Sequence, residues 1–90
     1  MNNADYNSKK NLPLESVIQS RIIRRLQDEG WLVVKLSLTN LSGLPDLMAL
    51  KDGITKFIEV KRPGEKPRPL QEYRHSQLRA LGFDVEILTE

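Results

Sequence analysis

The sequence of 90 residues contains no cysteine and only one histidine, and 6% of its residues are aromatic. Without cysteine the chain can form neither a disulfide nor a thiolate metal site, which suits a reducing compartment. A zinc site built from cysteine and histidine is excluded for want of ligands. A glycine-rich loop of the kind that cradles phosphate is also missing. These absences remove several common classes of enzyme and metalloprotein.

Long hydrophobic runs are absent as well. No apolar segment reaches the roughly 18–20 residues of a membrane span, and the polar first residues lack a signal-peptide core. We therefore expect an intracellular protein, in the cytoplasm of a bacterium or of a phage-infected host, with no membrane partner. Hydrophobic residues make up 39% and charged residues 29% of the chain, which is typical of one globular domain. The net charge of +2 is a mild indication of an anionic partner.

Hydrophobic periodicity divides the chain into a polar tail, residues 1–11, and one domain, residues 12–90. Ile18, Ile22 and Leu26 fall on one stripe of a helix that ends near Gly30. The order that follows is three strands, a second helix and a last strand, over residues 31–38, 46–50, 54–61, 70–81 and 83–88. The proline-rich segment 62–69 between them should be irregular.

The pair Asp52-Gly53 lies between two apolar runs and is a strong hairpin signal. A two-residue turn there places Asp46 directly opposite Glu59, and a four-residue loop preserves that register, whereas a three-residue loop shifts it by one. Directly opposed residues share a face, with Cβ atoms about 4.5–5.5 Å apart. Lys61 points to the same face because it lies two residues beyond Glu59.

Two opposed carboxylates repel each other, so a positive charge must stabilise them. Lys61 could contribute, but a divalent cation does so better, because Mg²⁺ and Mn²⁺ prefer carboxylate oxygens. Glu15 lies on the apolar stripe of the first helix and could bring a third carboxylate to this site. Alternatively, Glu15 only interacts with the helix dipole, which is worth about 0.3–1 kcal/mol.

In this order the motifs resemble the Pro-Asp…(Asp/Glu)-x-Lys nuclease superfamily, and within it the small stand-alone form of the VRR-NUC family. The resemblance covers about residues 14–88 and rests on Glu15, Gly43-Leu44-Pro45-Asp46-Leu47, Ile58-Glu59-Val60-Lys61, Pro69-Leu70-Gln71, Leu78 and Gly82. It implies an α/β fold with a small mixed sheet, element order α-β-β-β-α-β, and a restriction-endonuclease-like core.

The resemblance also implies an activity. Members of this family are phosphodiesterases that use Mg²⁺ or Mn²⁺ on DNA, and the stand-alone forms resemble homodimeric endonucleases selective for branched DNA such as Holliday junctions. Carried onto this sequence, the metal ligands would be Glu15, Asp46, Glu59 and the backbone carbonyl of Val60. Lys61 would orient or activate the attacking water. Gln71 corresponds to a helical glutamine near the site.

Basic side chains suggest where DNA could bind. Lys35 and the loop residues Arg62, Lys66 and Arg68 could contact the phosphate backbone, or could simply be solvated surface charges. We expect a symmetric dimer, in which segment 62–69 could act as a hinge for exchanging the last helix and strand.

Two further residues carry expectations, and two other functions remain open. We expect Trp31 in the core and His75 as a solvent-facing helix residue. The chain could instead be a non-catalytic nucleic-acid-binding module with the same fold. It could also be an interaction domain in which Glu59 and Lys61 form only a structural ion pair.

Overall fold

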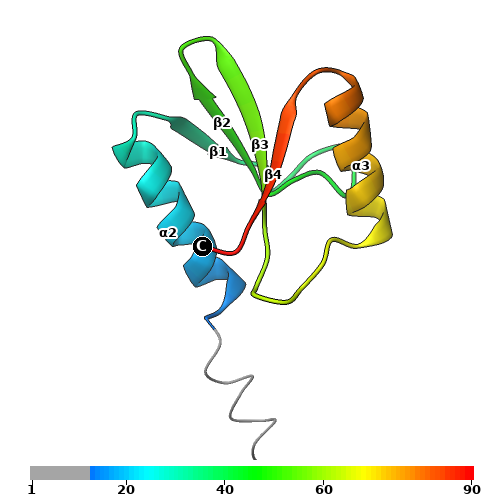
Figure 1. The fold of residues 1–90 in the computed structure, drawn as a ribbon, viewed down its shortest axis with the longest axis horizontal. Coiled ribbons are helices and arrows are strands. Elements are labelled where there is room, and N and C mark those ends of the chain that lie inside the picture. Colours follow the sequence, from blue (N-terminus) through cyan, green and yellow to red (C-terminus); the bar gives the residue numbers. More distant parts are fainter. Residues whose placement is uncertain (1–12) are drawn as a thin grey trace, which may run out of the picture.

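The computed structural model describes residues 13–90, so the predicted tail and the start of the domain at Leu12 lie outside the described residues. The elements follow in the order helix, three strands, helix, strand, as predicted (Figure 1). Their bounds are α2 (Glu15–Asp28), β1 (Leu32–Lys35), β2 (Leu47–Lys51), β3 (Ile54–Val60), α3 (Pro69–Ala80) and β4 (Asp84–Leu88). Neither helix in this part of the chain is long and apolar enough to cross a bilayer.

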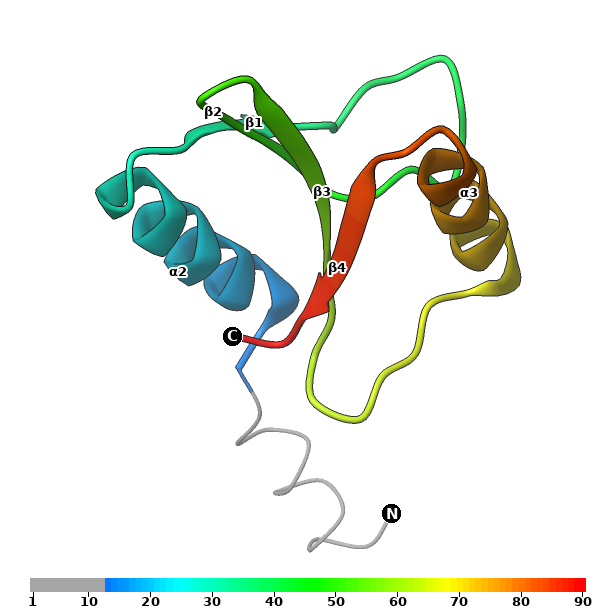
Figure 2. The same cartoon turned by 45° about the horizontal axis from the view of Figure 1, so that its top comes forward.

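The four strands form one mixed sheet in the order β1-β2-β3-β4. Strand β2 is antiparallel to both β1 and β3, and β4 is parallel to β3 because the chain crosses over through α3. Helix α2 packs on one face of the sheet and α3 lies on the other side (Figures 1 and 2). The predicted α/β class with a small mixed sheet is confirmed.

The β2–β3 hairpin has the predicted two-residue turn. Asp52 and Gly53 both have positive φ angles, 50° and 77°, as a type I′ turn requires. Lys51 pairs with Ile54, and the ladder continues in the same register to Leu47 and Ile58. One step further along this register, residue 46 faces residue 59.

Strand β1 is shorter than the predicted strand 31–38. It ends at Lys35 because its partner β2 begins at Leu47 and offers no further strand residue. One last bond, from the Leu36 N–H to the Asp46 carbonyl at 2.8 Å, ties the chain to the site. Beyond it Leu38 is fully exposed, so the prediction was wrong for residues 36–38.

The loop that follows β1 returns against the start of α3. Gly43 has a φ of +83°, and a Cβ there would lie 2.7 Å from Leu70 Cγ and 2.9 Å from the Leu70 carbonyl oxygen. Only glycine therefore fits without displacing α3. This close approach fixes the path of the chain into Pro45 and Asp46.

The apolar core lies between α2 and the sheet. The predicted stripe of Ile18, Ile22 and Leu26 is buried against four strand residues, namely Leu47, Ala49, Ile58 and Val60. Trp31, expected in the core, is only partly buried and packs against its edge. On the α3 side the apolar contacts are fewer, and they include an edge-to-face pair of Phe57 and Phe83 with ring centroids 5.7 Å apart.

Candidate metal centre

Three carboxylates meet where β3 ends, β2 begins and α2 starts. Glu15 is the first residue of α2, Asp46 directly precedes β2, and Glu59 is the second-last residue of β3. Each offers an oxygen atom within 4.8 Å of the others. Elements distant in sequence thus bring together the three acids that the sequence analysis selected.

Asp46 is held in place by hydrogen bonds from two strands. Its carbonyl oxygen accepts the Leu36 N–H, and its side-chain Oδ2 accepts the Val60 N–H at 2.8 Å. The second bond directs the Asp46 carboxylate across to β3. The side chain is half-buried, so it faces the cluster while keeping some access to solvent.

Glu59 is completely buried, and its two oxygens have different partners. Oε1 lies 3.2 Å from His75 Nε2, while Oε2 lies 3.4 Å from Gln71 Nε2 and 4.0 Å from Lys61 Nζ. Burial raises the pKa of Glu59 to about 8, helped by the hydrogen bond and charge of Asp46 and by the charge of Glu15. The ammonium of Lys61 opposes this shift only in part.

Lys61 directly follows β3 and is 6% exposed. Its backbone N–H donates to the Leu88 carbonyl at 3.0 Å, which keeps the chain in the β3–β4 ladder for one more residue. The side chain therefore enters the cluster from a fixed position. A lysine is rarely buried this deeply unless it is paired with an acid.

Gln71 reaches Glu59 from the first turn of α3. Its Oε1 accepts the backbone N–H of Arg68 at 2.8 Å. Because that N–H can only donate, the amide must present Nε2 to Glu59. The start of α3 thus fixes both the position and the polarity of this contact.

His75 contradicts our expectation of a solvent-facing residue. Its side chain is 1% exposed and contacts Glu59. Burial, followed by the charges of Arg79 and Lys61, lowers the pKa of His75, so the neutral imidazole is favoured. One signal could have located this residue, since His75 lies four residues after Gln71 and therefore on the same helix face.

The residues present fit a divalent cation. Glu15, Asp46 and Glu59 together carry three negative charges when ionised, whereas Lys61 is the single cation bonded to them in the described residues. Burial is the main cause of the raised pKa of Glu59, and the negative charges of Asp46 and Glu15 add to it, so a further positive charge would favour the ionised carboxylate. Carboxylate oxygens are the ligands that Mg²⁺ and Mn²⁺ prefer.

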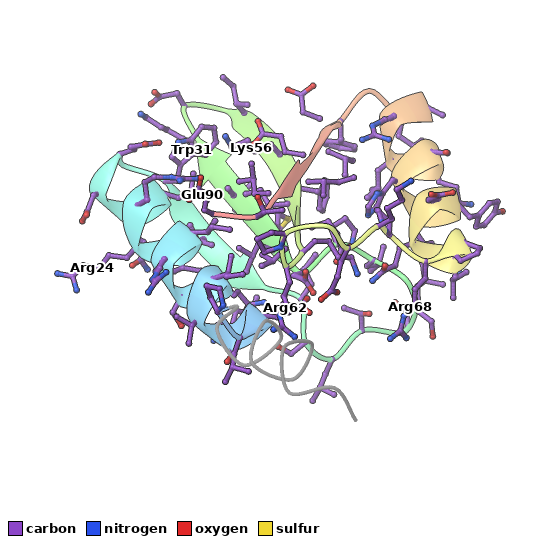
Figure 3. The ribbon with its side chains drawn as sticks, turned by 60° about the horizontal axis from the view of Figure 1, so that its bottom comes forward. Arg24, Trp31, Lys56, Arg62, Arg68 and Glu90 are labelled. Atoms are coloured by element: carbon purple, nitrogen blue, oxygen red, sulfur yellow. The ribbon has the colours of Figure 1, made fainter. Side chains whose placement is uncertain are left out.

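The four basic residues predicted to contact DNA occupy different settings. Lys35, Lys66 and Arg68 are exposed. Arg62 is half-buried, its Nε donates to the Pro13 carbonyl at 3.0 Å, and the guanidinium pairs with Glu65 at 3.9 Å. Figure 3 shows Arg62 beside the start of α2 and Arg68 beside the start of α3. Arg62 and Arg68 therefore lie beside different helices.

Comparison with known proteins places the chain and its fold in a class. No family model matches the chain. A curated protein described as "Putative nuclease p44", from Acyrthosiphon pisum secondary endosymbiont phage 1, is 37% identical over 75 residues, which cover 82% of this chain and 81% of that protein. A solved structure described as a VRR_NUC domain is 37% identical, with a TM-score of 0.75 and 81% of each chain covered.

The fold of this chain and the descriptions of its relatives together define a nuclease domain. The chain belongs to the VRR-NUC family, and the resemblance found in the motifs is confirmed.

Proposed function

We propose that this protein is an endonuclease that requires Mg²⁺ or Mn²⁺ and hydrolyses phosphodiester bonds in DNA. The observation that carries the proposal is the meeting of three carboxylates and a buried lysine at one end of the sheet of a VRR-NUC fold. The phage relative, described as a nuclease, supports the same reading. In this proposal residues 12–90 act as a single nuclease domain.

Glu15, Asp46, Glu59 and the backbone carbonyl of Val60 would hold the cation. When bound, a divalent cation stabilises charge on the phosphate oxygens and lowers the pKa of a water molecule. The chain prepares this site before the cation arrives, because Asp46 is fixed by the Val60 N–H and Glu59 by side chains of α3. Little reorganisation of the ligands would then be needed.

Lys61 would act on the attacking water or on the phosphate. An ammonium is a compact point charge with several donors, so it can orient a water molecule or contact a phosphate oxygen. Its place beside Glu59 keeps it next to the proposed metal ligands. Gln71 would steady the Glu59 carboxylate through the contact that the start of α3 fixes.

DNA would be held mainly through its phosphates. Lys35, Lys66 and Arg68 are exposed and free to reach the backbone, and Arg62 would contribute charge from its position between Pro13 and Glu65. Contacts of this kind position DNA without reading its sequence. Binding should weaken steeply as salt is added.

The substrate we favour is branched DNA such as a four-way junction, cut by a homodimer with one site in each subunit. Two sites related by a twofold axis could cut both strands of a symmetric junction. The segment 62–69, which is irregular up to the start of α3 at Pro69, would act as the hinge that allows α3 and β4 to exchange between subunits. We place this activity in the cytoplasm of a bacterium or of a phage-infected host. A monomeric mass in light scattering at micromolar concentration would contradict both the dimer and the exchange.

The test is a panel of linear, flap, fork and four-way-junction DNA, incubated with Mn²⁺, Mg²⁺ or EDTA. We expect cleavage with either metal, none with EDTA, and the highest rate on the junction. Asp46→Asn should abolish cleavage, whereas the matched control Asp84→Asn, an exposed acid at the start of β4, should not.

Other outcomes would replace the proposal. Binding of DNA without cleavage under every metal condition would indicate the non-catalytic binding module. If the protein neither binds nor cleaves DNA, the remaining alternative is the interaction domain.

A further inference from the structure

Among residues 13–90, His75 is the one buried ionisable side chain near the carboxylates that the proposed reaction does not use. It lies in the middle of α3, is 1% exposed, and places Nε2 3.2 Å from Oε1 of Glu59. A histidine buried this fully gives up its contact with water, so its remaining polar contact matters. That contact is made to a proposed metal ligand and not to the core.

Helix α3 holds both oxygens of the Glu59 carboxylate. Gln71 contacts Oε2 and His75, one helical turn later, contacts Oε1. A carboxylate held by one oxygen can still rotate about its last side-chain bond, whereas contacts to both oxygens fix its plane. Because Arg68 fixes the Gln71 amide, His75 supplies the second point that stops this rotation.

We propose that His75 is a positioning residue, whose Nε2 contact with Glu59 holds this carboxylate in the plane in which it meets a cation together with Asp46 and Glu15. The inference rests on the proposed function, because it concerns the same metal centre. Hydrogen-bond partners behind metal ligands commonly change metal affinity 10–100-fold when removed, and the partner here comes from a helix on one face of the sheet. His75 does not touch the cation in this proposal.

A role in packing alone makes a different prediction. If His75 only filled space, an apolar side chain of similar size would serve as well, and the position of a polar atom would not matter. The amide nitrogen of glutamine can reach about the place of histidine Nε2, while that of asparagine reaches only about the place of Nδ1. His75→Gln and His75→Asn therefore separate the hydrogen bond from the occupied volume.

The experiment measures Mn²⁺ binding by calorimetry without DNA, for the full chain and for His75→Leu, His75→Asn and His75→Gln. We expect the Leu and Asn variants to bind Mn²⁺ about 10–100-fold more weakly. The Gln variant should bind close to the wild-type affinity. Thermal unfolding with and without Mn²⁺ gives a second readout, in which the Leu and Asn variants should lose most of the metal-induced increase in Tm.

Val85→Ala is the matched control. Val85 is a buried residue of β4, the strand that α3 contacts, and its register partner on β3 is Phe57, whereas that of Glu59 is Ile87. This variant should lower the Tm of the metal-free protein and leave the Mn²⁺ affinity unchanged. Loss of stability by itself would then be separated from loss of positioning.

Two results would overturn the inference while leaving the proposed function intact. One is wild-type Mn²⁺ affinity in all three variants, and the other is an equal weakening in Asn and Gln. Wild-type protein that fails to bind Mn²⁺ would overturn the proposed function itself, which is a separate observation. If His75→Leu does not fold, the Mn²⁺ affinities of His75→Gln and His75→Asn still test whether the Nε2 contact positions Glu59.

Discussion

The two faces of β3 are equally buried and chemically opposite. Ile58, Glu59 and Val60 are consecutive, and each is completely shielded from solvent. Ile58 and Val60 pack into the apolar cluster under α2, whereas Glu59 meets polar side chains of α3. The two helices lie on opposite sides of the sheet (Figure 2). A single strand therefore carries the stable core on one face and the candidate metal centre on the other.

This difference shows that burial has two uses in the molecule. On the α2 side, removing apolar surface from water stabilises the fold. On the α3 side, the same burial raises the pKa of Glu59 to about 8 and disfavours the ionised form that a metal ligand needs. A group kept where its charge is disfavoured is a candidate functional group.

The largest expected effect is a loss of DNA cleavage when the ionisable carboxyl group of Glu59, on the α3 side, is replaced. Glu59→Gln keeps the size and hydrogen-bonding reach of the side chain but cannot ionise, so we expect cleavage of junction DNA to fall by at least about 10²–10³-fold. The metal-free protein should be no less stable than wild type at pH 8. The measurement is single-turnover cleavage, with Glu29→Gln, a change of an exposed acid just after α2, as control. Retained cleavage would show that Glu59 is not part of the reaction.

A cavity on the α2 side should lower stability and leave cleavage unchanged, which is the reverse of the result expected for Glu59→Gln. Ile22 is completely buried in the core, and Ile22→Ala should lower the free energy of unfolding by about 2–5 kcal/mol. Urea unfolding measures this loss. Below the melting transition, cleavage per folded molecule should stay near wild type, because Ile22 is not one of the residues that form the carboxylate cluster. A large loss of activity without unfolding would mean that the two faces are not separable.

The third-largest effect should be the pH dependence of the free energy of unfolding, which comes from the ionisable groups on the α3 side of β3. The pKa of Glu59 is about 8 in the folded protein, whereas the ordinary value for a glutamate, which the unfolded chain should show, is 4.5. Its contribution to stability is therefore complete below pH 4.5 and is lost as pH rises to about 8, since the unfolded chain ionises first. His75, whose pKa is lowered from 6.5, acts in the other direction, and its contribution is lost only as pH falls below that value.

Between pH 6.5 and about 8 the Glu59 contribution should therefore dominate. Urea unfolding in EDTA should show the stability of wild type falling across this range, and Glu59→Gln should flatten the curve. Mn²⁺ should stabilise wild type more as pH rises, because the cation displaces the Glu59 proton. A flat wild-type curve would indicate that Glu59 is already ionised in the metal-free protein.

Local sequence signals were enough to predict the two acids of the hairpin. Asp52-Gly53 favours a type I′ turn by backbone conformation alone, and that turn fixes the register that brings residue 46 opposite residue 59. The period of the first helix likewise predicted the buried stripe in line with Glu15. Each of these inferences needed only neighbouring residues.

The features that sequence did not reveal depend on how separate elements dock. His75 is buried because of how α3 is rotated about its axis, which the weakly apolar sequence of this helix does not determine. The length of β1 depends on where β2 begins, because a strand without a partner cannot continue its ladder. The spacing of Gln71 and His75 was a usable signal, but only once Gln71 was known to face the site.

The smallest effect should come from an ion pair on the α2 side. Lys56 and Glu86 lie 3.6 Å apart, with 17% and 43% of their side chains exposed. Because water screens this pair, Glu86→Gln should change the free energy of unfolding by no more than about 1 kcal/mol, and less at high salt. Lys56 would also keep its position 4.5 Å from the Trp31 ring centroid. Urea unfolding could instead show that Glu86→Gln lowers the free energy of unfolding as much as Ile22→Ala does. Depth of burial would then not explain the difference between the two faces of β3.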